Sequence, residues 1–203
     1  MTPSTMVPTA RPEMGRRAAE QLLIAHGIDT SRPAILGRRG YYRDALGVPG
    51  ANDIGIYDDA IILVTPTAYL TCNANCDPSR HHPGVAVLQA GVWRYKLGIH
   101  NASKDPALHP HYEALVQAGP VTVRRDPDAS HVEPWLDTGW FGINIHRGGY
   151  TTTSSEACQT VYPDQYDGFI VLVKSEISRY QVVDIPYVLT ERPNAPTSPE
   201  GAL

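Results

Sequence analysis

The chain contains 203 residues, with 17 glycines, 18 prolines and three cysteines. That length supports one substantial hydrophobic core, and so few cysteines exclude a disulfide-stapled miniprotein. The formal net charge is −4 and the cationic side chains are scattered singly or in pairs, which excludes the concentrated basic stripe of a nucleic-acid-binding surface. Apolar runs such as residues 60–64 are far shorter than the roughly 20 residues that cross a bilayer. We therefore expect a monomer with neither a nucleic acid nor a membrane as partner.

Composition divides the chain into one domain and two flanking segments. Residues 1–10 are rich in proline, serine and threonine, and residues 191–203 contain three prolines and a glycine, which predicts disordered ends. Residues 11–190 are predicted to form a single β-rich domain with an N-terminal helix. The first residues lack the basic region and apolar run of a secretory leader, so we expect synthesis in the cytoplasm.

The predicted elements change from helix to strand along the chain. Pro12 and Glu13 open a helix that Gly27 ends. The glycine-rich residues 31–59 are predicted to be loop without an assigned role. Seven later runs rich in Val, Ile and Tyr predict strands, and Pro163 begins a short helical turn. The fold class is therefore mainly β, a β-rich sandwich or barrel with short helical turns. The seven runs are residues 61–65, 85–89, 92–97, 121–124, 140–146, 169–174 and 181–189.

The run at 140–146 places a histidine at a strand end. Strand alternation puts Phe141, Ile143 and Ile145 on one face, which suits the core. His146 then lies on the face away from the core. The next turn contains Gly148 and Gly149, and glycines permit close approach by a ligand.

A cysteine follows this histidine after twelve residues. Thr153 and Glu156 have the spacing of a capping box, which predicts a helical turn just before Cys158. A helix N-terminus and a nearby imidazole both favour a reactive thiolate, and the amides of Ala157 and Cys158 are placed to bind an oxyanion. The alternative is that Cys158 is a buried structural thiol and His146 an ordinary strand-end histidine.

The two segments together resemble the catalytic signature of the L,D-transpeptidase family of peptidoglycan enzymes. That signature is a strand ending in His, a glycine-containing loop, and a Ser-His-Gly-Cys sequence that bears the nucleophile. The counterparts in this chain are residues 143–149 and residues 155–158, within a close match over about residues 140–173. The resemblance implies the family's β-rich catalytic domain and no cofactor.

The resemblance also implies a role for each residue of the motif. Cys158 attacks a stem-peptide carbonyl to form a thioester, His146 is its general base, and the main-chain carbonyl of Arg147 orients the ring. Ser155 supports the nucleophile loop, and the Ala157 and Cys158 amides form the oxyanion hole.

One departure from the signature directs the choice of reaction. Glu156 stands where the family has a second histidine, and a carboxylate beside the thiol changes which charged groups the cleft tolerates. We expect a hydrolytic, bacteriolytic enzyme like a phage endolysin, which reaches the cell wall or periplasm after release. The alternatives are a transpeptidase that forms cross-links, and a non-catalytic wall-binding or virion structural module.

Two groups of histidines offer a metal site instead. Cys72 and Cys76 are followed by His81 and His82, but their spacing is not that of a structural zinc site, and a polar loop or a local disulfide is the other interpretation. A zinc amidase would use such residues. We expect no metal. The second group, which we interpret as solvent-facing loop residues, is His100, His109, His111 and His131.

Two further groups of charged side chains have structural and functional interpretations. Arg94 and Lys96 form the solvated face of a half-buried strand or line a groove for acidic peptides. Asp53, Asp58 and Asp59 are interpreted as turn or capping residues, although paired carboxylates also cleave glycosides.

Overall fold

The computed structural model describes residues 6–192. Most of the two ends predicted to be disordered lies outside this range. The prediction is wrong at its inner margins, because the Met6 carbonyl accepts a hydrogen bond from Tyr57 N at 2.7 Å and Arg192 N donates to Arg39 O at 3.1 Å.

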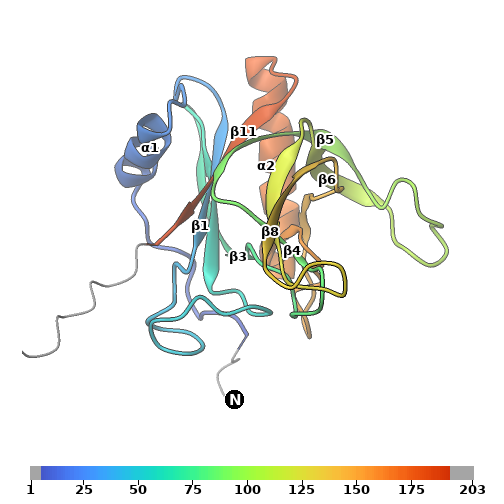
Figure 1. Ribbon diagram of the computed structural model, residues 1–203. Coiled ribbons are helices and arrows are strands. Elements are labelled where there is room, and N and C mark those ends of the chain that lie inside the picture. Colours follow the sequence, from blue (N-terminus) through green and yellow to red (C-terminus); the bar gives the residue numbers. More distant parts are fainter. Residues whose placement is uncertain (1–5, 193–203) are drawn as a thin grey trace, which may run out of the picture.

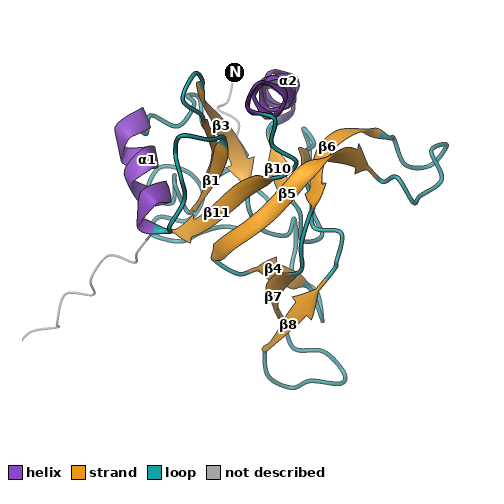
Figure 2. Cartoon of the chain, turned by 90° about the horizontal axis from the view of Figure 1, so that it is seen from above, coloured by secondary structure: helices purple, strands orange, loops and turns teal. Residues whose placement is uncertain are grey.

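The mainly β fold class is confirmed, with eight strands closing into a barrel (Figures 1 and 2). Six of the eight strand pairs are antiparallel, and β1–β11 and β9–β10 are parallel. Closure leaves no open sheet edge in the barrel. In order around the barrel the strands are β1 (Ala34–Arg39), β11 (Ile185–Glu191), β5 (Gly91–His100), β6 (Tyr112–Gln117), β9 (Ile145–Arg147), β10 (Gln159–Val161), β3 (Tyr69–Asn75) and β2 (Asp59–Val64).

Helix α1 (Arg16–Ala25) covers one outer side of the barrel. Its buried residues Ala19 and Leu23 pack on the outward residues of β2, whereas Ile61 and Leu63 of the same strand face the interior. Burial on both faces explains why β2 is an unbroken apolar run. The predicted N-terminal helix is thus confirmed, although it begins at Arg16 rather than at Pro12.

A second sheet of three strands lies beside the barrel. It contains β4 (Ala86–Leu88), β7 (Val121–Arg125) and β8 (Trp135–Gly139), in the order β4-β7-β8. The predicted strand at 140–146 is only partly correct, because residues 140–144 are irregular and Gly142 has φ +71°. The chain leaves β8, turns at this glycine, and enters the barrel as β9.

The predicted strand at 169–174 is wrong, because these residues belong to α2 (Pro163–Tyr180). Pro163 does begin a helix, as expected, but the helix has 18 residues rather than one turn. The side chains of Phe169, Val173 and Ile177 are buried at intervals of four. That spacing is helical, and it outweighs the β propensity of the sequence Phe-Ile-Val-Leu-Val. Neither helix in the described range has the length and apolarity needed to span a membrane.

The interpretation of residues 31–59 as loop is wrong for β1, which closes the barrel between β2 and β11. Position 37 of this strand needs a glycine, because a Cβ there would lie 2.2 Å from the hydroxyl oxygen of Tyr187. A glycine that signals a turn by composition therefore makes room for a buried ring.

A buried ionic cluster joins one end of β1 to the turns around it. Arg39 is 5% exposed, forms an ion pair with Asp77 at 3.0 Å, and donates to the carbonyls of Cys76 and Leu88. Asp59, fully buried, accepts from Gly40 N and Cys76 N, both at 2.5 Å. The carboxylates of Asp53, Asp58 and Asp59 all accept hydrogen bonds from backbone N–H groups, which fits the capping interpretation, although Asp59 begins β2 and is not part of a turn.

Candidate active site

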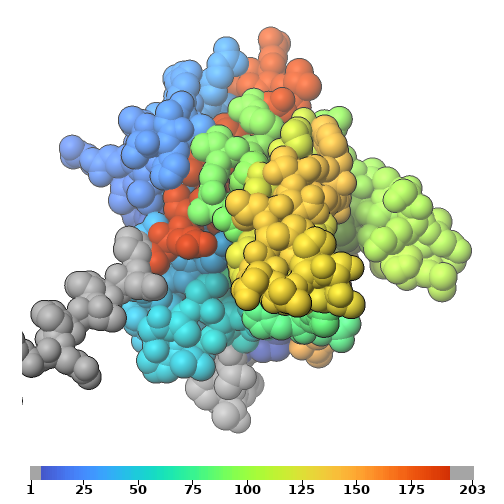
Figure 3. Space-filling model, in the orientation of Figure 1, coloured from blue at the N-terminus to red at the C-terminus, as the bar shows by residue number. Residues whose placement is uncertain are grey.

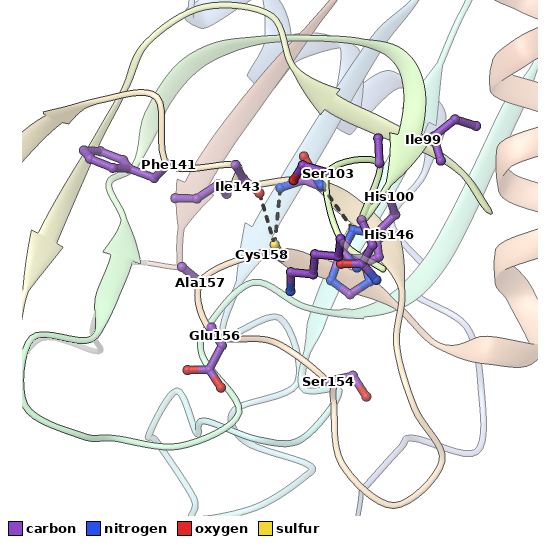
Figure 4. A pocket seen from close by; sticks show the side chains of 15 residues that line it. Ile99, His100, Ser103, Phe141, Ile143, His146, Ser154, Glu156, Ala157 and Cys158 are labelled. Atoms are coloured by element: carbon purple, nitrogen blue, oxygen red, sulfur yellow. Dashed lines mark hydrogen bonds between the residues drawn. The ribbon is translucent and has the colours of Figure 1, made fainter. Parts of the chain in front are cut away.

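One cavity brings together residues that are far apart in the sequence. It has a volume of about 520 Å³, and Cys158 and His146 both line it (Figure 4). The β5–β6 hairpin contributes residues 99–104, and the segment after β8 contributes residues 141–144. The tip of this hairpin projects from the barrel as a separate lobe in Figure 3.

Strand pairing explains why Cys158 and His146 share this cavity. β9 and β10 are parallel neighbours, with His146 level with Thr160. Ile145 and Val161 belong to the hydrophobic core. Because side chains alternate along a strand, His146 and Cys158 project from the opposite face. The predicted orientation of His146, away from the core, agrees with this register.

The Cys158 sulfur is held by the backbone of residues 142–144. Asn144 N donates to Sγ at 3.3 Å, and the thiol donates to Gly142 O at 3.7 Å (Figure 4). Burial raises the pKa of this thiol to about 11, and the nearby Glu156 carboxylate adds to the effect, while the Asn144 amide and the Lys104 ammonium oppose it. Cys158 is therefore a neutral thiol at pH 7.

The predicted helical turn before Cys158 is wrong, because residues 151–158 are irregular and lead directly into β10. Side-chain hydrogen bonds hold this loop in place of a helix. Ser155 Oγ donates to Cys158 O at 2.7 Å, and Ser155 N donates to Ser79 Oγ at 2.7 Å. Ser155 thus anchors the loop that precedes Cys158, and no helix N-terminus lowers the thiol pKa.

The amides of Ala157 and Cys158 remain available at the cavity wall. Among residues 6–192, neither N–H donates to a protein acceptor. Unpaired N–H groups next to a nucleophile are the donors that an oxyanion requires.

His146 is fixed by its neighbours and is only 3% exposed. Its Nδ1 lies 2.7 Å from Arg147 O and 3.2 Å from the Tyr112 hydroxyl. A carbonyl can only accept, so Nδ1 carries the proton and Nε2 is left as the acceptor. The expected contact of the ring with the Arg147 carbonyl is present. Within the described chain, no hydrogen bond joins the imidazole to the Cys158 thiol.

A second imidazole, not expected at this site, stacks on the first. The rings of His100 and His146 are 4.0 Å apart and inclined by 20° (Figure 4). His100 is held in turn by Asn144, whose Nδ2 lies 3.1 Å from His100 Nδ1. Burial, the adjacent His100 and the Lys104 ammonium lower the pKa of His146 to about 3 against the opposing effect of the Arg147 carbonyl. Burial and Lys104 lower the pKa of His100 to about 4, so both rings are neutral at pH 7.

Gly148 and Gly149 lie outside the cavity that contains Cys158. A Cβ at Gly148 would be 2.1 Å from the Tyr57 hydroxyl oxygen, and that hydroxyl donates to Gly149 O at 2.7 Å. The close approach that these glycines permit is therefore by Tyr57, not by a ligand at the thiol.

Charged groups of opposite sign line the cavity. Lys104 comes from the β5–β6 hairpin and Glu156 from the loop that precedes Cys158. In the described part of the chain no carboxylate lies within 4.0 Å of the Lys104 ammonium, whereas Glu156 pairs with His82 at 3.0 Å. Glu156 is placed as the motif predicts, while Lys104 is a site residue that the sequence analysis did not identify.

The residues of the alternative metal sites lie apart. Cys72 and Cys76 are buried free thiols. His81 pairs with Asp126 and His82 with Glu156, both at the surface. Over residues 6–192, no group of three or more His, Cys, Asp or Glu side chains is placed to hold a metal ion. Cys72 and Cys76 do not form the local disulfide considered above, because four residues of extended chain separate their Cα atoms by about 13 Å.

Of the second group of histidines, only His100 lines the cavity, and the cations Arg94 and Lys96 do not line it. His111 Nε2 contacts Lys104 O at 3.0 Å, and His131 stacks on Trp135. Arg94 pairs with Asp184 across the strand face, so the solvated-face interpretation of Arg94 and Lys96 fits better than a peptide groove.

The raised thiol pKa predicts the alkylation behaviour of Cys158. Only about one thiol in 10⁴ is ionised at pH 7 if the pKa is about 11, so iodoacetamide should label native Cys158 slowly. The rate should rise about tenfold per pH unit up to the pKa. Peptide mass spectrometry after timed labelling measures this rate, and the buried Cys72 and Cys76 serve as internal controls that label only on unfolding. A rate that is already maximal at pH 7 would contradict this prediction.

Comparison with protein-family models, with curated proteins and with solved structures found no match to this chain.

Proposed function

We propose that this protein is a cysteine-dependent acyl-transfer enzyme that cleaves stem peptides of peptidoglycan. The observation that carries the proposal is the placement of Cys158, of a neutral His146 with its Nδ1 proton fixed, and of two unpaired amides around one cavity. A nucleophile, a base with an orienting group and oxyanion donors are the components of acyl transfer. The choice of peptidoglycan rests on the resemblance of residues 143–149 and 155–158 to the L,D-transpeptidase signature.

The chemistry proceeds through a thioester. As the sulfur attacks the peptide carbonyl, the thiol proton passes to Nε2 of His146, and the amides of Ala157 and Cys158 bind the resulting oxyanion. Collapse of the tetrahedral intermediate breaks the C–N bond, and the imidazolium returns the proton to the leaving amine. Water then attacks the thioester, with His146 again accepting a proton, which releases the acid and restores the thiol.

Glu156 favours water over an amine as the second acceptor. The carboxylate is exposed at the cavity and stabilises the ammonium form of an approaching amine. An ammonium group has no lone pair and does not attack a thioester. We therefore propose peptidoglycan hydrolysis of the endolysin kind, acting at the cell wall, with cross-link formation as the alternative reaction of the same thioester.

A non-catalytic wall-binding or virion structural module is the second candidate. The observation that favours it is that, within residues 6–192, no hydrogen bond joins His146 to the Cys158 thiol, so the thiol has no base in contact with it. The raised pKa of Cys158 agrees with this candidate.

One experiment separates these candidates. Wild type and Cys158→Ala are incubated with purified peptidoglycan, and the soluble fragments and the intact protein are analysed by mass spectrometry. Hydrolysis predicts shorter peptides and an acyl adduct on wild type only, whereas transpeptidation predicts new cross-links. Equal products from the two proteins would contradict the mechanism, and binding without products would favour the module.

A further inference from the structure

The face of the three-stranded sheet next to the cavity carries an unusual exposed row of side chains. Burial alternates along β8, so that Leu136 and Thr138 are exposed, and the alternation continues to Trp140 just beyond the strand. Leu136 and Trp140 are each 65% exposed. β8 lies in the yellow region that faces the viewer in Figure 3. Apolar side chains exposed together on one strand face are candidates for a binding surface.

The polar groups of this row are suited to a sugar. Thr138 is paired with Thr122 of β7, and their hydroxyl oxygens lie 2.8 Å apart at the surface. Hydroxyl groups donate and accept, as sugar hydroxyls do. The indole N–H of Trp140 donates to no acceptor within residues 6–192, and its ring face attracts the weakly positive C–H groups of a pyranose. From Leu136 to Trp140 the row extends about 13 Å, enough for a disaccharide.

A buried glutamine fixes this row relative to the thiol. Gln117 is only 5% exposed, and its side-chain Nε2 donates to Gly139 O at 2.8 Å. Its Oε1 accepts from Phe141 N and Ile143 N, both at 3.2 Å. The backbone on both sides of Trp140 is therefore tied to the barrel, and Gly142, two residues further on, contacts the Cys158 sulfur.

The separation matches the geometry of a stem peptide. Two residues of backbone separate Trp140 from Gly142 by at most about 7 Å. Gly142 O lies a further 3.7 Å from the Cys158 sulfur. The total, at most about 11 Å, is close to the roughly 10 Å that three extended peptide residues span. Peptidoglycan carries each stem peptide on a glycan strand. A peptide whose scissile carbonyl lies at Cys158 therefore brings its sugar to the level of Trp140.

We propose that Leu136, Thr138 and Trp140 form a glycan subsite that binds the sugar attached to the stem peptide in the cavity. This inference rests on the proposed function, and it assigns a ligand class to residues outside the cavity. Trp140 stacks on the sugar ring, and the Thr122 and Thr138 hydroxyls bond its polar edge. The subsite makes the protein selective for peptide that is still attached to glycan.

Sedimentation with peptide-free glycan strands tests the subsite without any cleavage. Wild type and Cys158→Ala should both co-sediment, and Trp140→Ala should bind about three- to tenfold more weakly because it loses one aromatic stack. Trp140→Phe should retain most of the binding. Val183→Ala, an exposed apolar control that is 85% exposed after α2, should bind as wild type does. Equal binding by wild type and Trp140→Ala, or no binding by wild type, would overturn the subsite.

Kinetics then relate the subsite to cleavage. The KM of Trp140→Ala should rise about three- to tenfold for a disaccharide-linked stem peptide and stay unchanged for the same peptide freed of sugar. An equal effect on both substrates would overturn the subsite and place Trp140 in peptide binding or folding. If wild type binds glycan but cleaves neither substrate, the acyl-transfer proposal fails while the glycan subsite stands. If a second protein bound to Leu136, Thr138 and Trp140 and added glycan did not displace it, the subsite would be overturned and the row would be a protein-docking face.

Discussion

Replacement of His146 by alanine is expected to lower the rate of thioester formation about 10²- to 10⁴-fold, the usual contribution of a positioned general base. The effect should be large because Cys158 is a neutral thiol and needs an acceptor for its proton during attack. Stopped-flow or quenched-flow mass spectrometry of the acyl adduct measures the step directly. His131→Ala removes an exposed histidine that lies outside the cavity and is the matched control.

The dependence of the acylation rate on pH is a second test of His146 as the base. The reactive pair consists of a neutral imidazole and a neutral thiol, and it exists between the pKa of His146, about 3, and that of Cys158, about 11. The rate constant for acylation should therefore be flat from about pH 5 to pH 8. A limb with its midpoint near the ordinary histidine pKa of about 6.5 would contradict the neutral pair. His146→Ala within threefold of wild type would contradict the base itself.

Replacement of Arg39 by methionine is expected to lower the free energy of unfolding by about 3–5 kcal/mol, as removal of one partner from a buried ion pair does. Methionine fills similar space but leaves Asp77 without its countercharge and the Cys76 and Leu88 carbonyls without a donor. For a chain of this size the loss corresponds to a fall in Tm of roughly 10 °C. Thermal and urea unfolding followed by circular dichroism measure it.

A substitution of the neighbouring Arg38 and a change of pH provide the controls for Arg39→Met. Arg38→Met removes a partly exposed guanidinium from the same strand and should cost less than about 1 kcal/mol. Burial raises the pKa of Asp58 to about 7 and that of Asp59 well above its ordinary value. These carboxyl groups bind protons more tightly folded than unfolded, so their contribution favours folding below the unfolded pKa of about 4 and is lost as the pH rises through the folded pKa. The Arg39→Met defect should accordingly be smaller at pH 5 than at pH 8, and a pH-independent defect would show that the charges play no part.

Composition predicts those strands in which the strand's own apolar residues are enough to indicate a buried β-strand. β2 and β5 carry the Val, Ile and Tyr residues that favour a pleated, buried surface. β3 contains Thr, Asn and Cys, and β1 contains a glycine and two arginines, so neither has a local signal. β1 is a strand because Gly37 accommodates the Tyr187 ring and Arg39 pairs with Asp77, and β3 is a strand because it pairs with β2 and β10. Such contacts involve residues more than thirty positions apart and leave no local pattern.

The candidate site divides in the same way. The relation of His146 to the Arg147 carbonyl is local and could be predicted from two adjacent residues. The stacking of His100 on His146 depends on the β5–β6 hairpin, in which His100 pairs with Tyr112 across an irregular loop. Only that pairing brings His100 and Lys104 to the cavity and the Tyr112 hydroxyl to His146, so in the sequence they appear merely as a histidine-rich stretch and a tyrosine.

The parallel pairing of β1 with β11 has a consequence for synthesis. Residues 35–39 find their partners at 187–191, so the barrel cannot close until almost the whole described chain has left the ribosome. Until then β1 and β2 expose apolar faces and the candidate nucleophile has no completed framework around it. Folding that waits for such distant contacts is slow. The nascent protein should therefore complete its candidate cavity only after β11 has left the ribosome, so that the cavity forms later than the strands that line it.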